Sequence, residues 1–501
     1  MAIDRTIKAT IIYLTAFTMI ACTSNPINPG ARQSKLDNFS SCRKFYNFFD
    51  HKVNQEQVND VQAHQLKHYP FISVNRLLAS FSTELNSGNK MDFWLKQTVK
   101  LNLQARKIEW QNLSATSKAQ ISRHFLHNSS FEQRAATCSE TFLKNLSKDD
   151  KQNIQKQAHV PDDYSLLMRI LGIYPISSLF VSRQIEKHQA EVRKTFSTPL
   201  KQLAVKGTLQ RYIPTPTALT YPGHIEYKNP LNIPFLTTHE LNDLFNRYAP
   251  VLEIDEVSSY DQAGSIVLDK RGNIQVNTFK PVVYVMPGYT RFNHQILLQL
   301  NYFFWFPERP PEKKGDIYAG KLDGIIWRVT LNHNMKPLIF DSAHNCGCYH
   351  KFYITNQLKF RIKVANAERE PPFVAQDSLS VQNRVPWVLR ISSINHFIER
   401  IYQDKSVAKN AKTYQLANYN QLRSLSNGKI SKSLFNDEGI VMASVRKERF
   451  VLWPMGVPYA GAMRQWGHHA IAFVGKRYFD DPFLLNKFFS PVKKSGDNTN
   501  F

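Results

Sequence analysis

The chain changes character at about residue 205, and this change limits the folds available to it. Residues 39–200 carry apolar side chains at helical spacing, such as Leu95, Val99 and Leu103, in segments rich in Lys, Gln and Leu. Residues 205–490 instead hold short runs of β-branched and aromatic residues separated by Gly, Asn and Asp. We therefore predict an α+β protein, in which a helical N-terminal domain (39–200) precedes a strand-rich, mainly antiparallel C-terminal domain (205–490).

Several runs in the C-terminal half have the length and boundaries of strands. The clearest hairpin pairs residues 324–331 with 337–340 across an Asn-His-Asn turn. A second turn, over 269–273, separates two further strand-like runs. The remaining predicted strands cover residues 281–286, 295–306, 385–394, 450–453 and 470–474.

The first 22 residues have the pattern of an export signal. Arg5 and Lys8 precede an uncharged, mostly apolar run, Ala9–Ala21. The run is too short for a permanent membrane helix, which needs ~20 apolar residues. Its end, Met-Ile-Ala-Cys with the cysteine at Cys22, resembles the lipobox of bacterial lipoproteins.

The lipoprotein resemblance implies a location as well as a modification. It implies that residues 1–22 form a signal ending at a Cys22 that carries acyl chains, palmitate among them. Thr23 stands where lipoproteins retained in the inner membrane carry Asp, so the resemblance implies the periplasmic side of the outer membrane. Residues 23–38 contain Pro, Gly and Ser without apolar periodicity, which predicts a flexible tether.

The chain is strongly basic, with 64 Lys and Arg against 40 Asp and Glu and a net charge of +24. An exported protein meets little nucleic acid, so we expect no nucleic-acid partner. Its expected partners are the membrane, through the lipid anchor, and an anionic envelope polymer or lipopolysaccharide. A basic composition with solvated lysines explains the charge equally well.

Four cysteines remain after Cys22, and the periplasm favours their oxidation. Cys42 and Cys138 each lie on an apolar helical face in the N-terminal half, so we predict a disulfide between them, with two buried free thiols as the alternative.

The densest group of reactive side chains lies within residues 341–350. His344, Cys346, Cys348 and His350 are spaced by two, so they would share one face if the strand continued. One interpretation is a zinc or iron site. A second is a cysteine nucleophile, Cys346 or Cys348, activated by His344. A third is a strained Cys346–Cys348 disulfide or plain packing. The candidate metal ligands are His294, His344, Cys346, Cys348, His350, His468 and His469.

Two other segments are candidates for binding. Arg291, Arg464 and Trp466 lie in stretches rich in aromatic residues and are predicted to line a binding pocket. Residues 166–181 are nearly all apolar, which favours a buried helix pair hinged at Pro175. The alternative is a segment that dips into the membrane surface.

Three stretches, 322–332, 337–352 and 461–481, resemble uncharacterised proteobacterial envelope proteins, a resemblance that covers residues 280–482 and implies no activity. We expect an outer-membrane-anchored lipoprotein that acts as a metal- or thiol-dependent hydrolase on an envelope component. The alternative is a non-catalytic lipoprotein that binds lipid or lipopolysaccharide or scaffolds assembly. Convergence of His344, Cys346 and His468 in a cleft would favour the enzyme, and an exposed apolar patch at residues 170–181 would favour the alternative.

Overall fold

The structure is a computed structural model that describes residues 40–217, 228–406 and 410–492. The predicted signal (1–22), its Cys22 and the predicted tether (23–38) lie outside the described residues.

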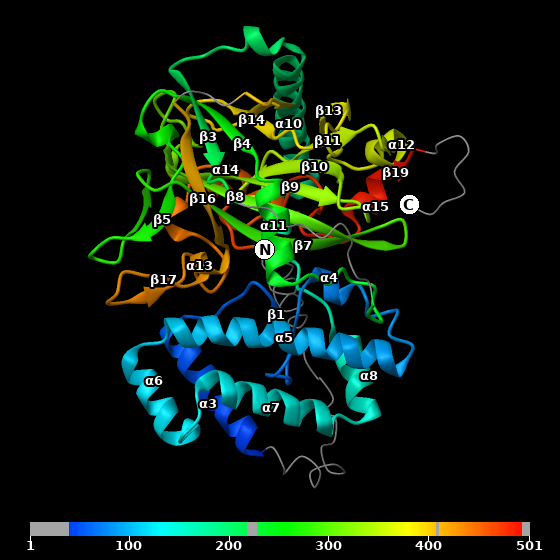
Figure 1. Ribbon diagram of the computed structural model, residues 1–501, viewed down its shortest axis with the longest axis vertical. Coiled ribbons are helices and arrows are strands. Elements are labelled where there is room, and N and C mark those ends of the chain that lie inside the picture. The colour runs from blue at the N-terminus through cyan, green and yellow to red at the C-terminus, as the bar shows by residue number, and fades with distance from the viewer. Residues whose placement is uncertain (1–39, 218–227, 407–409, 493–501) are drawn as a thin grey trace, which may run out of the picture.

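A helical part forms one end of the molecule (Figure 1). Its helices are α3 (Ser40–Glu56), α4 (Arg76–Ala79), α5 (Gly88–Asn112), α6 (Ala115–Ile121), α7 (Phe131–Asn145) and α8 (Lys148–Gln157). Ser130 and Ser147 begin α7 and α8 with capping boxes, which satisfy free N–H groups at both helix starts.

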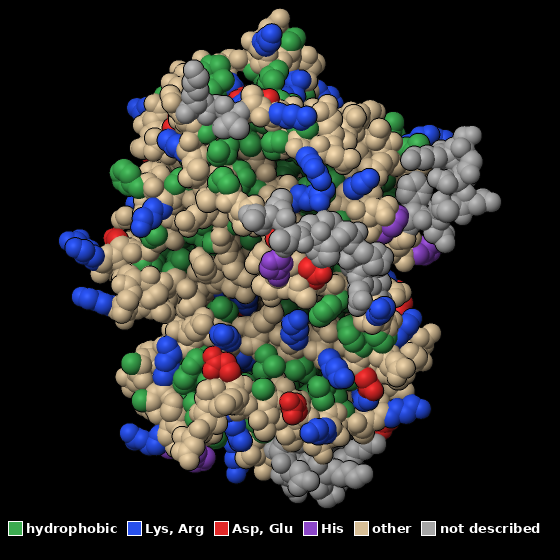
Figure 2. Space-filling model, in the orientation of Figure 1, with side chains coloured by type: hydrophobic (Ala, Val, Ile, Leu, Met, Phe, Trp, Pro, Cys, Tyr) green, Lys and Arg blue, Asp and Glu red, His purple; other side chains and the backbone are tan. Residues whose placement is uncertain are grey.

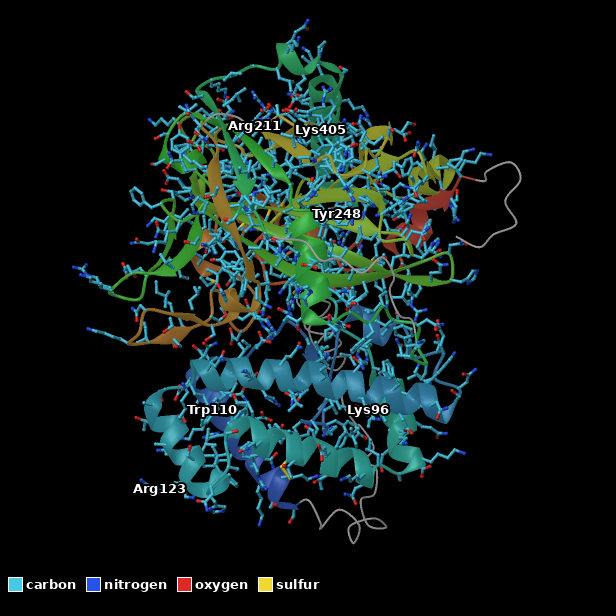
Figure 3. The ribbon with its side chains drawn as sticks, in the orientation of Figure 1. Lys96, Trp110, Arg123, Arg211, Tyr248 and Lys405 are labelled. Carbon is cyan, nitrogen blue, oxygen red and sulfur yellow. A yellow bond between two sulfur atoms is a disulfide. The ribbon has the colours of Figure 1, made fainter. Side chains whose placement is uncertain are left out.

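Aromatic packing and a disulfide hold the helical part together. Trp110 of α5 stacks on Phe131 of α7, with ring centroids 4.7 Å apart (Figure 3). Cys42 of α3 and Cys138 of α7 form a disulfide, with 2.09 Å between the sulfur atoms, which is the pairing expected from the sequence. The bond links α3 to α7, and its two cysteines are 96 residues apart in the sequence.

The C-terminal part is built on one eleven-stranded sheet. In spatial order its strands are β13 (Val374–Leu379), β11 (Lys351–Thr355), β10 (Pro337–His344), β9 (Gly320–Leu331), β8 (Gln295–Arg309), β7 (Val282–Phe292), β16 (Lys412–Asn418), β3 (Thr208–Pro214), β4 (Val251–Glu256), β14 (Trp387–Ile391) and β15 (Ile398–Gln403). The protein is therefore α+β, but its sheet is mixed. The pairs β13–β11, β7–β16, β16–β3 and β4–β14 are parallel. Each joins strands that a long connection separates, as parallel pairing requires.

The sheet curls until its two edges meet. The side-chain amide of Gln376 on β13 both donates to the carbonyl oxygen of Ile401 on β15 and accepts from the N–H of the same residue. The enclosed face carries a core that includes Tyr302, Trp327 and Leu389. The opposite face is covered by residues 419–489.

Shorter elements connect the strands. They are β1 (His64–Gln65), β2 (Ser73–Val74), β5 (Ser265–Leu268), β6 (Ile274–Asn277), β12 (Leu358–Phe360), β17 (Leu425–Ser426), β18 (Ser431–Lys432), β19 (Phe489–Pro491), α11 (Thr238–Arg247), α12 (Ile362–Asn366), α13 (Asn420–Arg423), α14 (Arg449–Leu452) and α15 (Leu484–Phe488). The predicted hairpin is confirmed as β9–β10, the turn at 269–273 joins β5 to β6, and the strands predicted near 281, 295 and 385 are β7, β8 and β14.

Two predicted strands are wrong. Residues 450–453 form a helical turn, α14, and residues 470–474 form only a single bridge between Ala470 and Tyr478. A four- or five-residue apolar run has no periodicity that separates a strand from a helical turn or a packed loop.

Helices α9 (Leu166–Leu171) and α10 (Tyr174–Ser197) pack on the sheet part, although the sequence placed them in the helical domain. α9 lies against the short 3₁₀ turn Trp453–Met455, and α10 contacts β13 and β15 along the seam of the curled sheet (Figure 1). The predicted burial of residues 166–181 is wrong, because polar and small residues form the packed side. Arg169 donates to the carbonyl oxygen of Met455, and a Cβ on Gly172 would lie 2.4 Å from Cβ of Pro454.

Within the described ranges, no helix is both long and apolar enough to cross a membrane. The two parts of the molecule are joined by polar contacts and by apolar packing of Leu231 and Ile296 against the helical core, and the surface is indented between them (Figure 2). Arg423 of the sheet part forms a buried ion pair with Asp60, and Arg291 pairs with Glu84 at 2.6 Å.

Candidate functional site

A cavity of about 1010 Å³ lies between α10 and the turn that joins β10 to β11. Phe180, His188 and Val192 line it from α10, while Lys351 and Phe397 line it from the sheet. Exposed residues also line the cavity, Phe180 and Arg183 among them, so it opens at the molecular surface.

Strand alternation decides which side chains reach this cavity. On β11, Lys351 and Tyr353 share the face that forms the enclosed core, whereas Phe352 packs on the opposite face. The charged Lys351 is thereby held at one end of the enclosed face. Ser342 of β10 pairs with Lys351, and His344 lies two residues further along the same face of β10.

The predicted common face of the four reactive residues is wrong, because the strand does not continue past His344. The N–H of His344 donates to the carbonyl oxygen of Cys348 at 2.9 Å, which closes a tight turn. Gly347 in this turn has φ of 94°, a conformation that favours glycine. After the turn, His350 points to the face opposite His344 and bonds to Asp341 at 2.9 Å.

His344 belongs to a buried chain of acids and imidazoles. Its Nδ1 lies 3.6 Å from Asp323, whose carboxylate also bonds to His396 at 2.7 Å and to Arg446 at 3.0 Å. Burial lowers the pKa of His344 to about 4, so its ring is neutral. Burial opposes the charged form of His396 too, but its hydrogen bonds to Asp261 and Asp323 outweigh burial and raise its pKa. The negative charge of Asp323 is thus shared between Arg446 and His396.

Cys346 and Cys348 are free thiols in the structure, and both are buried. The N–H of Cys348 donates to the Sγ atom of Cys346 at 3.4 Å. The hydrogen bond with Cys346 and burial together raise the pKa of Cys348 well above its ordinary value. A nucleophilic thiolate requires the opposite shift, so this environment does not favour Cys348 as a nucleophile.

The candidate metal ligands do not come together. Across residues 40–217, 228–406 and 410–492, no group of three or more His, Cys, Asp or Glu side chains is arranged to hold a metal ion. His468 instead bonds to Asp163 and to the carbonyl oxygen of Val61. His469 is buried, which lowers its pKa to about 3, and His294 is exposed in the β7–β8 turn.

The predicted binding residues all have structural contacts, and Trp466 also lines a second cavity of about 1030 Å³. Arg291 bonds to Ser80 and Glu84 of the helical part. Arg464 donates to the carbonyl oxygen of Pro458, and Trp466 packs on Phe303 with centroids 6.1 Å apart. None of the three lines the cavity beside α10.

Sequence reasoning missed the basic residues of that cavity. Arg309 ends β8, Lys351 begins β11 and His188 lies on α10, so only the fold brings them together. Burial first, and then the charge of Lys351, lower the pKa of His188 to about 4. The one available signal for this site was Lys351, which begins a fully buried strand, since lysines are rarely buried.

An exposed apolar surface adjoins the cavity mouth, and we call it the α9–α10 patch. Its side chains are between 57% and 71% exposed. They are Leu166, Leu167, Ile170, Leu171, Ile173, Ile176, Leu179 and Phe180. Phe180 also lines the cavity, together with Val451 of α14, so the patch continues into it.

Comparison of the chain with protein-family models, curated protein sequences and solved structures finds no match.

Proposed function

We propose that the protein is a lipid-anchored envelope protein that docks on a membrane surface through the α9–α10 patch and binds lipid there. The observation that carries this proposal is the exposure of eight large apolar side chains within fifteen residues. Soluble proteins rarely leave such a surface in water unless it binds something. Each side chain moved into lipid contributes ~1–2 kcal/mol, so partial insertion of the patch is sufficient for measurable binding.

The surroundings of the patch favour lipid over a protein partner. Exposed Arg183 and Lys187 follow it on α10, and Lys447 is exposed just before α14. A basic residue near an anionic lipid surface contributes ~1 kcal/mol. An apolar face beside a basic one is typical of segments that lie in the membrane interface. The predicted acyl chains on Cys22 would keep the patch close to a membrane.

Vesicle co-sedimentation tests the proposal. The chain from residue 23 onward, which lacks the predicted signal and acyl groups, is mixed with vesicles of phosphatidylethanolamine and phosphatidylglycerol. We expect it to bind, and we expect Leu167→Asp combined with Ile176→Asp to weaken binding at least tenfold, because a charge in the interface opposes insertion. Phe279→Asp is the matched control, since Phe279 is 96% exposed on the β6–β7 loop, away from the patch.

Equal binding by the patch variant and the Phe279→Asp control would refute docking through the α9–α10 patch. Loss of binding in both variants would show a general effect of added negative charge. Circular dichroism of each variant reports whether the fold is retained.

A further inference from the structure

Two buried cations face the cavity beside α10, and neither forms an ion pair with a described carboxylate. Arg309 is 5% exposed, and its Nε and Nη1 atoms have no hydrogen-bond partner among the described residues. Lys351 is 3% exposed, and its ammonium group lies 5.2 Å from the centroid of the Phe397 ring without an ion pair to a described carboxylate. A buried charge without an ion pair is costly, and such groups often mark binding sites.

The carboxyl groups nearest to these cations do not neutralise them. Burial raises the pKa of Glu448 to about 7, so at neutral pH only about half of this group is ionised. Glu399 lies 3.8 Å from Arg390, and burial raises its pKa as well. The cavity floor therefore retains a net positive charge.

The other carboxyl groups of the cavity are largely engaged elsewhere. Glu370 accepts hydrogen bonds from the backbone N–H groups of Phe473 and Val474. Glu312 accepts from Asn395, and Asp316 accepts from backbone N–H groups in its own loop. Glu191 lies on α10 and is exposed at the rim.

The walls above this charged floor are apolar. They are formed by Phe180 and Val192 of α10, Phe373 before β13, Phe397 before β15 and Val451 of α14. An anion alone would use the floor and leave these walls in contact with water. A molecule with an anionic head and an apolar chain would use both, and about 1010 Å³ is at the upper end of the ~300–1,000 Å³ usual for small-molecule sites.

We infer that the cavity binds one amphiphile, with a phosphate or carboxylate headgroup at Arg309 and Lys351 and an acyl chain that runs along α10 toward Phe180. This inference rests on the proposed function for its source of ligand, because the chain of the amphiphile would reach the α9–α10 patch and the membrane beyond it. The cavity itself is complete without a membrane, so the two can be tested separately.

Titration calorimetry with dodecyl phosphate tests the inference on the purified protein. We expect saturable binding of one molecule, with dodecanoate also bound, whereas inorganic phosphate and the uncharged dodecyl maltoside bind at least tenfold more weakly. Arg309→Gln combined with Lys351→Met should weaken dodecyl phosphate binding at least tenfold, since both charge-assisted contacts are lost. Lys270→Met, an exposed change in the β5–β6 turn, is the matched control.

Three results would overturn the inference. Dodecyl maltoside bound as tightly as dodecyl phosphate would show a site for apolar chains only. Inorganic phosphate bound as tightly would show an anion site without a chain. Unchanged affinity in the double variant would place the headgroup elsewhere.

The comparison of dodecyl phosphate, inorganic phosphate and dodecyl maltoside on the wild type remains valid even if the double variant fails to fold. The Leu167→Asp and Ile176→Asp changes lie outside the cavity, so that variant should still bind dodecyl phosphate. In that variant, loss of vesicle binding with retained amphiphile binding supports both proposals. In the wild type, vesicle binding without dodecyl phosphate binding would support docking and overturn the cavity site, whereas dodecyl phosphate binding without vesicle binding would support the cavity site and refute docking.

Discussion

Lys351 is the residue whose position is hardest to explain by stability alone. Burial lowers its pKa from 10.5 to about 8, and the charge of Glu399 offsets this only in part. At about pH 7 the folded protein must hold Lys351 in its charged form. This lowers the free energy of unfolding by ~3 kcal/mol relative to a lysine whose pKa stays at 10.5. We therefore predict that Lys351→Met, which keeps the chain length and removes the charge, raises the melting temperature at neutral pH.

The same shift gives this gain a pH dependence. Between about pH 8 and about pH 10.5 the unfolded chain binds a proton that the folded Lys351 has lost, so the wild type becomes more stable as the pH rises. The advantage of Lys351→Met should therefore shrink across this range in paired thermal melts. Of the other groups that face Lys351, His188 and His344 have a pKa of about 4 and Glu448 of about 7, so they titrate mainly below this range. Arg309 and Glu399 are the remaining charged groups near Lys351, and they are present in both proteins. A gain that is constant with pH would mean that the Lys351 amine has the same pKa in the folded and the unfolded chain.

At the scale of elements, the turn between β10 and β11 fixes which side chains reach the cavity. Gly347 combines a φ of 94° with close packing, because a Cβ there would lie 2.4 Å from the carbonyl oxygen of Ala470. Gly347→Ala should lower the free energy of unfolding by ~2–4 kcal/mol, from backbone strain and displacement of the segment around Ala470.

The matched control for the turn is Gly475→Ala. Gly475 has φ of 112°, but a Cβ there would have no atom of the described chain within 4 Å. It therefore shares the backbone strain and lacks the clash. Chemical denaturation of both variants separates the two costs, and equal losses would show that contact with Ala470 contributes nothing to the turn.

The elements also show how far the sequence could predict this fold. The β9–β10 hairpin follows from local signals, since its turn residues lie between two strand-like runs. The face of His350 could not be predicted, because it depends on a reversal at Gly347 that is stabilised by contacts with Ala470, more than a hundred residues away. The apolar run 166–181 gives no sign of which side is packed. That depends on Met455 and Pro454, which lie far along the chain.

For the molecule as a whole, the central question is whether its helical part and its sheet part unfold together. Arg423 of the sheet part is buried, and its Nε donates to Asp60 at 2.9 Å. Gln465 donates to the same carboxylate at 2.7 Å. Asp60→Asn would leave the buried guanidinium of Arg423 without its counter-charge, which costs ~3–5 kcal/mol.

The ion pair lies at the junction of the two parts rather than in either core, so its loss should reduce the cooperativity of unfolding. We predict that far-ultraviolet circular dichroism and tryptophan fluorescence give one coincident urea transition for the wild type and separate transitions for Asp60→Asn. Asp92→Asn is the control, because Asp92 forms an exposed ion pair with Lys151 and such pairs contribute ~0–1 kcal/mol. A single, uniformly shifted transition in Asp60→Asn would mean that apolar contacts across the junction suffice to couple the parts. In that case the whole chain would still unfold as one unit, so docking of the α9–α10 patch on a membrane would stabilise both parts.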